Sequence, residues 1–263
     1  MTQSLLSIDK FLADKRLLGA SLNMSTRATW LTTWKATYAL PLSDAEREIF
    51  ARIAGGRQPP IKRVREVWID AGRRGGKSEE AAAVAIHSAL FVEHRLSRGE
   101  IGMVLVVAGT RDQARVVFGY IKGFLDASAT LRREVINMTR EEITLRNGIV
   151  IAVHSNSFRT VRGRTLVAAV FDEVAFWRDE TSASPDIEVY RAVLPSLATT
   201  NGILIGISTP YRRMGLLYQK YRDHFGQDGA DVLVVRGSTQ TFNPTLTDQT
   251  IAAQRAADPT SAM

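Results

Sequence analysis

No feature constrains the fold of this chain more than residues 71–78, which read AGRRGGKS. A run with strand character precedes them at 67–70, and an alanine-rich segment from Glu79 to Leu96 is predicted as a helix. This order of strand, glycine loop, Lys-Ser and helix is typical of a phosphate-binding loop, because glycines let backbone N–H groups approach a triphosphate closely. We predict that Lys77 reaches the β- and γ-phosphates of ATP and that the Ser78 hydroxyl ligates Mg²⁺.

The first position of this pattern departs from the consensus, which has glycine where this chain has Ala71. Gly72 follows directly, so we expect the turn to be shifted rather than lost. The alternative is a glycine-rich surface turn that happens to contain Lys-Ser, but the flanking strand and helix favour a nucleotide site. The ATP-binding residues predicted in the loop are Gly72, Arg74, Gly75, Gly76, Lys77 and Ser78.

The composition bounds the class of protein. With 263 residues, 45% of them apolar and 23% charged, the chain is long enough for one large soluble α/β domain, with or without small appendages. It contains no cysteine and only four scattered histidines, which excludes disulfides and gives no zinc pattern. The sequence shows neither a long apolar run nor a secretory signal, so no membrane contact is expected. A net charge of +7 permits a polyanionic partner.

Residues 1–56 are expected to form an N-terminal helical extension packed on the core. Ser43 and Glu46 predict a capping box at the start of a helix that runs to about Ile53. The candidate buried anchors of this region are Phe11, Leu17, Leu18, Trp30, Leu31, Trp34 and Tyr38.

Residues 57–245 are predicted to form the core. Apolar runs at 103–108, 166–171 and 203–207 are typical of central strands in a parallel sheet. An amphipathic helix capped by Thr110 follows the first run. We therefore predict an α/β phosphate-loop NTPase fold, with a mainly parallel, doubly wound sheet flanked by helices.

An antiparallel addition to this sheet is also predicted. Segments 142–145 and 149–153 read as a hairpin, and Asn147-Gly148 between them indicates a type I′ turn.

Two adjacent acids, Asp172 and Glu173, end the strand at 166–171. Open α/β sheets bind ligands beyond the carboxyl ends of their strands, where the glycine loop also lies. We predict that Asp172 holds the Mg²⁺ shell and that Glu173 polarises the attacking water. The alternative is an acidic N-terminus of the next helix.

Ser208 and Thr209 follow the strand at 203–207. Hydroxyls at this place can sense hydrolysis and pass it on, although the sequence alone shows only a strand end with a turn proline. Upstream of the loop, Arg57 and Gln58 are candidates for contacting adenine, and a solvated turn held by two prolines is an equal alternative.

Arg159, Arg162 and Arg164 cluster just before the acidic strand. An arginine there can supply charge to a phosphoryl-transfer transition state, contact DNA phosphates or lie in solvent. Spacing alone does not separate these roles.

Together these residues resemble the ATPase portion of the large terminase subunit of tailed bacteriophages. The resemblance covers nearly the whole chain and rests on the order and spacing of its motifs. These are Trp34 with Leu40-Pro41-Leu42-Ser43, Gly56-Arg57-Gln58-Pro59-Pro60, 72–78, Thr110-Arg111-Asp112-Gln113-Ala114, Arg162-Gly163, Asp172-Glu173 and Ile207-Ser208-Thr209-Pro210-Tyr211.

The resemblance implies an ATP- and Mg²⁺-dependent motor that packages double-stranded DNA into a procapsid, in the cytoplasm of the infected bacterial host. Its implied partners are the portal protein, the small terminase subunit and further copies of itself in a pentameric ring. Ser208 and Thr209 match the motif that couples hydrolysis to movement. Arg162 matches an arginine finger that reaches the neighbouring subunit's ATP, and Arg73 matches an arginine given that role in other members.

Full-length terminases also carry a C-terminal nuclease domain. Residues 246–263 resemble the start of the linker towards it, so we expect this chain to lack nuclease activity. Two other functions compete. A superfamily 2 helicase-like ATPase is disfavoured because Val174-Ala175 follows Glu173 instead of the expected Asp-Glu-x-His/Asp pattern. A nucleotide-binding scaffold that does not hydrolyse is disfavoured by Glu173 itself.

Overall fold

The computed structural model describes residues 5–156, 163–177, 185–229 and 231–257. Within them the chain forms an eight-stranded sheet in the order β3-β4-β5-β2-β6-β7-β1-β8. The strands are β1 Glu66–Ala71, β2 Gly102–Ala108, β3 Val135–Met138, β4 Glu142–Leu145, β5 Val150–Ser155, β6 Thr165–Asp172, β7 Ile203–Ser208 and β8 Val232–Gly237. From β5 to β8 neighbours pair in parallel, whereas β3 and β4 add an antiparallel edge. The predicted fold class is confirmed.

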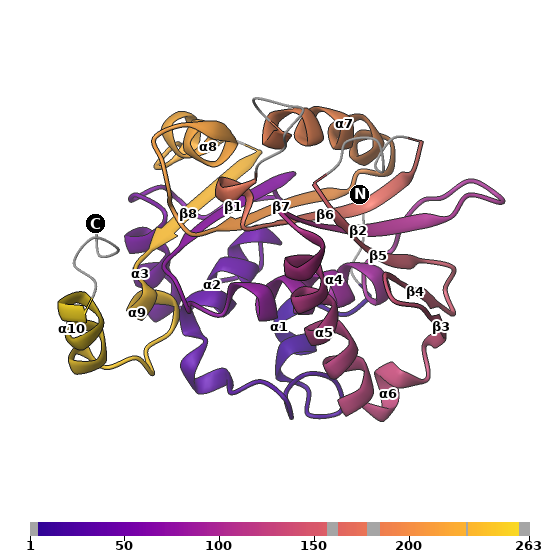
Figure 1. The fold of residues 1–263 in the computed structure, drawn as a ribbon, viewed down its shortest axis with the longest axis horizontal. Coiled ribbons are helices and arrows are strands. Elements are labelled where there is room, and N and C mark those ends of the chain that lie inside the picture. Colours follow the sequence, from indigo (N-terminus) through magenta and orange to yellow (C-terminus); the bar gives the residue numbers. More distant parts are fainter. Residues whose placement is uncertain (1–4, 157–162, 178–184, 230, 258–263) are drawn as a thin grey trace.

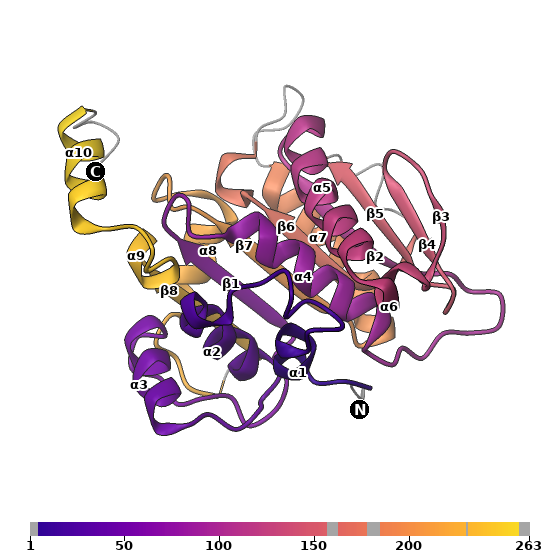
Figure 2. The same cartoon turned by 90° about the horizontal axis from the view of Figure 1, so that it is seen from below.

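Helices cover both faces of the sheet. They are α1 Ile8–Ala13, α2 Ala28–Thr37, α3 Asp44–Ile53, α4 Lys77–Leu90, α5 Arg111–Ala127, α6 Ala129–Arg132, α7 Pro185–Thr200, α8 Gly215–His224, α9 Thr239–Phe242 and α10 Asp248–Ala257. Helices α7 and α8 lie on one face, and α2, α4 and α5 lie on the other (Figure 1). Helix α10 extends away from the body (Figure 2). No helix in the described part of the chain is long and apolar enough to cross a membrane.

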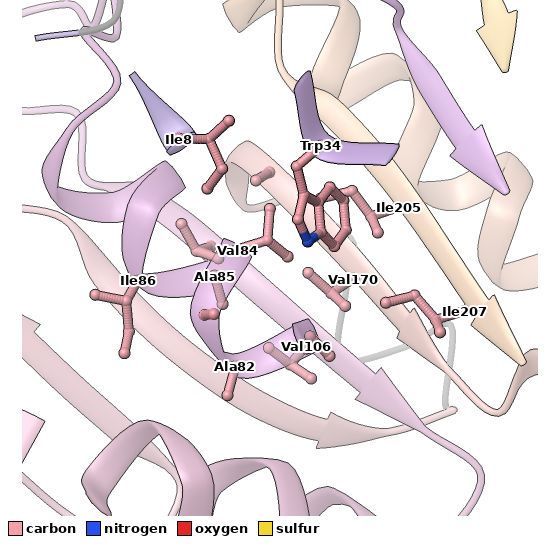
Figure 3. Close-up of a cluster of buried hydrophobic side chains, with 14 of the residues drawn as sticks. Ile8, Trp34, Ala82, Val84, Ala85, Ile86, Val106, Val170, Ile205 and Ile207 are labelled. Carbon is pink, nitrogen blue, oxygen red and sulfur yellow. The ribbon is translucent and has the colours of Figure 1, made fainter. Parts of the chain in front are cut away.

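The core is built on both sides of the sheet because side chains alternate along each strand. In β2, Val104 and Val106 join the cluster under α4, whereas Leu105 and Val107 join the cluster under α7 and α8. Figure 3 shows Val84 and Ala85 of α4 close to the valines and isoleucines of the sheet. The small side chains of α4 let this helix lie close to the strands, which fixes the direction of the loop before it.

The N-terminal helices pack on the same cluster as α4. Five of the predicted anchors are buried, and Leu31 and Tyr38 are half-buried and pack against them. The capping box of α3 is confirmed: the Glu46 N–H donates to Ser43 Oγ at 3.3 Å, and the Ser43 N–H donates to Glu46 Oε2 at 2.7 Å.

Two local predictions were wrong. Helix α4 ends at Leu90 and not at Leu96, because the chain folds back and the His94 ring donates from Nε2 to the Ser88 carbonyl at 2.7 Å. The hairpin turn is not type I′, which needs positive φ at both central residues. Only Gly148 has it, at +82°, and its N–H donates to the Leu145 carbonyl at 3.0 Å, as in a three-residue loop with the glycine left-handed.

Candidate functional site

The phosphate loop spans Gly72–Gly76, between the end of β1 and the start of α4. Ala71 is still part of β1, so the turn starts at Gly72, as predicted. A Cβ atom at Gly72 would lie 2.4 Å from the Thr239 nitrogen, so only glycine fits. Gly76 has a φ of +87° and caps α4. The loop therefore presents the N-terminus of a fourteen-residue helix, which carries partial positive charge.

Lys77 is buried at the centre of the site, with 6% of its surface exposed. Its Nζ donates to Thr209 Oγ1 at 2.7 Å and to the Gly72 carbonyl at 3.1 Å, and lies 3.3 Å from Glu173 Oε1. The ammonium thus links the ends of three strands, β1, β6 and β7.

Asp172 is almost fully buried beside Ser78. The Ser78 hydroxyl lies 3.5 Å from Asp172 Oδ2, while Oδ1 has no hydrogen-bond partner among the described residues. Burial, together with the adjacent Glu173 carboxylate, raises the pKa of Asp172 to about 7. An unpartnered carboxylate oxygen next to a hydroxyl is the donor set that Mg²⁺ favours, so these two residues fit that cation.

Glu173 has a left-handed backbone, with φ 51° and ψ 42°, which costs a non-glycine residue ~1–3 kcal/mol. Three contacts to β7 hold it there. Its N–H donates to the Ile207 carbonyl at 2.8 Å, and its Oε2 accepts from the Thr209 N–H at 3.0 Å and from Ser208 Oγ at 3.2 Å. The carboxylate is thereby placed between Lys77 and the predicted coupling residues.

The predicted arginines that the structure describes in the loop and next to β6 are exposed. Arg73 and Arg74 are exposed on the loop, and Arg74 has a φ of +59°. Arg159 and Arg162 lie outside the described residues, and Arg164 is exposed at the start of β6.

Arg57 and Gln58 do not join the site. Arg57 is buried, and its Nη1 donates to the Val232 carbonyl at 2.9 Å. Val232 pairs with Glu66 at the amino end of β1, whereas the loop follows Ala71 at the carboxyl end. Five strand positions at ~3.3 Å each separate the two ends by about 16 Å. The prediction that these two residues contact adenine is corrected accordingly, and the alternative of a turn at the sheet's other end describes them better.

Sequence reasoning missed three side chains at the loop. Asp70 is buried in β1, and Arg236 lies 3.3 Å from its Oδ2. Trp30 Nε1 donates to the Gly75 carbonyl at 2.8 Å, and Asn243 Nδ2 donates to the Arg74 carbonyl at 2.9 Å. An acid inside an apolar strand was a readable signal for Asp70. The other two come from distant parts of the chain, and no local pattern marks them.

A separate cavity of about 220 Å³ lies between α5 and the ends of β4 and β5. Its lining is mixed in charge and includes Arg111, Arg115, Arg140, Glu141 and His154. It shares no residue with the phosphate loop, so it is not the nucleotide site.

A model of one protein family matches residues 47–223, more than half of the chain, and its description is the terminase large subunit, ATPase domain. This chain belongs to that family. The match begins within α3 and ends within α8, so it includes the loop, both acids and the Ser208-Thr209 pair. No curated protein matches this chain in sequence.

Solved terminase structures have the same fold. The ATPase domain of the Thermus phage P74-26 large terminase matches with a TM-score of 0.58 and 18% identity, covering 82% of this chain and 92% of that one. The HK97 bacteriophage large terminase matches with a TM-score of 0.68 and 14% identity, covering 98% of this chain and 52% of that one.

A large terminase of a thermophilic bacteriophage, in complex with ADP, matches with a TM-score of 0.58 and 15% identity, covering 88% of this chain and 49% of that one. This chain therefore spans about half the length of the HK97 and thermophilic phage proteins.

Proposed function

We propose that this terminase ATPase domain binds Mg-ATP and hydrolyses it to move double-stranded DNA into a procapsid. One observation carries the proposal: Lys77 Nζ lies 3.3 Å from Glu173 Oε1 and 2.7 Å from Thr209 Oγ1. Lys77, which would bind phosphate, is thus in direct contact with two other groups. These are the acid that would activate water and the hydroxyl that would couple hydrolysis to movement.

In this proposal ATP competes for Lys77. The β- and γ-phosphates bind the ammonium and the N–H groups at the start of α4, as anions do at helix N-termini. Lys77 then exchanges its contacts with Thr209 and Glu173 for phosphate oxygens. Nucleotide binding is thereby transmitted to the ends of β6 and β7.

Ser78 and Asp172 would hold Mg²⁺. When bound there, the cation neutralises charge on the β- and γ-phosphate oxygens. Binding it would also give Asp172 Oδ1 the partner that it lacks among the described residues.

Glu173 would orient the attacking water and accept its proton. Once Lys77 is bound to phosphate, the Glu173 carboxylate no longer has the ammonium as its partner and can contact the water instead. It stays bound to the Thr209 N–H and to Ser208 Oγ, so a change in its position moves the end of β7. This contact supports a coupling role for Ser208 and Thr209.

Two arginines compete to stabilise the transition state. By family resemblance we propose that Arg162 acts on ATP bound to the next subunit, with Arg73 in the loop as the alternative in cis. Mixing the Arg162→Ala and Glu173→Gln variants tests this, because a Glu173→Gln subunit retains the arginine that its neighbour needs. If rings form and the mixture is no more active than its parts, Arg73 in cis is favoured.

Phosphate release from Mg-ATP by the purified chain tests the hydrolysis. We expect turnover that is stimulated by linear duplex DNA, and we expect Lys77→Ala to lose both turnover and nucleotide binding. A chain that binds ATP but releases no phosphate, with or without DNA, would be the non-hydrolysing scaffold.

The remaining assignments come from the family. We propose that the domain works as part of a pentameric ring on the portal protein, with the small terminase subunit as a further partner, in the cytoplasm of the infected host. Residues 1–56, 57–245 and 246–263 would be the extension, the ATPase core and a linker.

A further inference from the structure

The phosphate loop is held from outside by two segments that precede and follow the core. On one side, Trp30 of α2 is buried and donates from Nε1 to the Gly75 carbonyl at 2.8 Å. On the other side, Asn243 follows α9 and donates from Nδ2 to the Arg74 carbonyl at 2.9 Å. Two successive carbonyls of the loop are therefore fixed by side chains of other elements.

The geometry of the peptide bond gives these contacts a consequence. In a trans peptide the C=O of one residue and the N–H of the next point in opposite directions. A Gly75 carbonyl that faces Trp30 turns the Gly76 N–H away from α2. An Arg74 carbonyl that faces Asn243 turns the Gly75 N–H back into the loop, where it donates to the Gly72 carbonyl at 3.2 Å. The contact with Asn243 thus closes the turn. The contact with Trp30 sets the direction of the Gly76 N–H, which lies at the start of α4.

We propose that Trp30 and Asn243 are positioning residues: the Asn243 contact keeps the turn closed, and the Trp30 contact turns the Gly76 N–H towards the phosphates of the nucleotide. This inference rests on the proposed function. It assigns to α2 and to the segment 239–243 a part in nucleotide affinity, beyond packing against the core.

Other contacts keep the two segments in place without these side-chain donors. Thr29 Oγ1 donates to the Thr241 carbonyl at 2.6 Å, and Arg27 of the same segment pairs with Glu79 and Glu80 at the start of α4. The Trp30 ring also packs on Phe242, with centroids 4.6 Å apart. A phenylalanine at position 30 keeps the ring contact and removes the donor, so the helix should remain seated.

Trp34 provides a matched control. It lies one turn along α2, is equally buried, and donates from its own Nε1 to Glu80 Oε2 at 2.7 Å instead of to the loop. Trp30→Phe and Trp34→Phe therefore each remove one indole hydrogen bond from the same helix. Only the first removes a contact with the phosphate loop.

Calorimetric titration with ADP and ATP, together with steady-state hydrolysis, tests the inference. We expect Trp30→Phe to raise the Kd of both nucleotides and the KM of ATP about three- to tenfold, as for one lost hydrogen bond, with kcat changed less than about twofold. Trp34→Phe should keep the Kd within about twofold of the wild-type value, although the melting temperature should fall in both variants. Equal nucleotide affinity of the two variants would overturn the role of Trp30.

Asn243→Ala tests the other side, even if Trp30→Phe fails to fold. Its control is Gln240→Ala. In α9, Gln240 donates from Nε2 to Asp248 Oδ1 at 2.6 Å, so this variant removes a hydrogen bond that does not involve the loop. Asn243→Ala should raise the nucleotide Kd about three- to tenfold and Gln240→Ala should not. If both match the wild type, Asn243 has no positioning role.

Lys77→Ala separates this inference from the proposed function. If the wild type binds nucleotide, Lys77→Ala does not, and the variants of Trp30 and Asn243 bind normally, the positioning role fails while the nucleotide site stands. If the wild type binds neither ADP nor ATP, both are overturned.

Discussion

The two ends of strand β1 both carry buried charged groups, and they satisfy them in different ways. At the amino end, both carboxylate oxygens of Glu66 are bound. Tyr190 donates to Oε1 at 2.8 Å, and Trp68 Nε1 and Lys220 Nζ donate to Oε2 at 2.9 and 2.6 Å. Lys220 also donates to the Tyr190 hydroxyl at 2.6 Å. This cluster joins β1 to α7 and α8.

At the carboxyl end, Asp70 of β1 and Asp172, which ends the nearby parallel strand β6, each have one buried carboxylate oxygen with no hydrogen-bond partner in the described residues. Burial raises the pKa of Asp70 to about 6, although Arg236 and Lys77 oppose the shift. The pKa of Asp172 rises to about 7 through burial and the neighbouring Glu173 carboxylate. The amino end thus uses its polar groups for stability, whereas the carboxyl end keeps ligand capacity at a cost in stability.

The largest effect, a fall in kcat, is expected at the carboxyl end on substitution of Glu173. Glu173→Gln removes the base and keeps the size of the side chain, so kcat should fall about 10²- to 10⁴-fold. Nucleotide affinity should not weaken, because the glutamine leaves Lys77 with one competitor fewer. Single-turnover hydrolysis and calorimetric titration measure the two. Turnover close to wild type would remove Glu173 from the catalytic role.

At the amino end, Lys220→Met should act on stability alone. The variant leaves Glu66 buried without its cation, and breaking a buried ion pair in this way costs about 3 kcal/mol in free energy of unfolding. Urea denaturation measures it, and Lys122→Met on the exposed face of α5 is the control, expected within about 0.5 kcal/mol of the wild type. A large loss of nucleotide affinity in a folded Lys220→Met protein would contradict the division between the two ends.

The raised pKa of Asp70 makes the stability of the carboxyl end depend on pH, which gives a further test of the comparison. An acid whose pKa is higher in the folded chain, here about 6 against 3.8, stabilises the fold below the lower value. That stability is lost as the pH rises through about 6. Asp70→Asn cannot titrate, so its free energy of unfolding relative to wild type should rise by about 2 kcal/mol between about pH 4.5 and about pH 7.5.

Urea denaturation at both pH values without Mg²⁺ measures this difference. Asp112→Asn, an exposed acid in the first turn of α5, is the control whose difference from wild type should stay constant. Parallel curves for Asp70→Asn and the wild type would show that Asp70 does not titrate in this window.

The sequence was a good guide wherever the determining interactions are local. The loop, the acids at the end of β6 and the capping box at Ser43 follow from short patterns, and the parallel direction of the strands brings the first two together. It failed where distant contacts decide. Arg57 lies near the loop in sequence, but its side chain binds the Val232 carbonyl at the start of β8. That position is at the amino ends of the strands, opposite to the loop. Trp30 and Asn243 are remote in sequence and yet contact the loop.

The smallest effect concerns Ser208, which links the carboxyl end to β7. Its hydroxyl donates to Glu173 Oε2 at 3.2 Å and accepts from the Ala175 N–H at 3.1 Å, whereas the Thr209 N–H holds the same carboxylate independently. Ser208→Ala therefore loosens Glu173 without releasing it. We expect kcat to fall about fivefold, as for one hydrogen bond, with the Kd of ATP unchanged.

Thr199→Ala on the exposed side of α7 is the matched control, because it removes a hydroxyl that donates to the Ser196 carbonyl of its own helix. A fall in kcat as deep as that of Glu173→Gln would mean that the Thr209 N–H alone does not hold the carboxylate. Ser208 would then be needed to place the base, and its contact with Ala175 would make the turn after β6 part of that support. No change in kcat would leave the Thr209 N–H as the contact that positions Glu173, and the coupling role would pass from the hydroxyl of Ser208 to the backbone of β7.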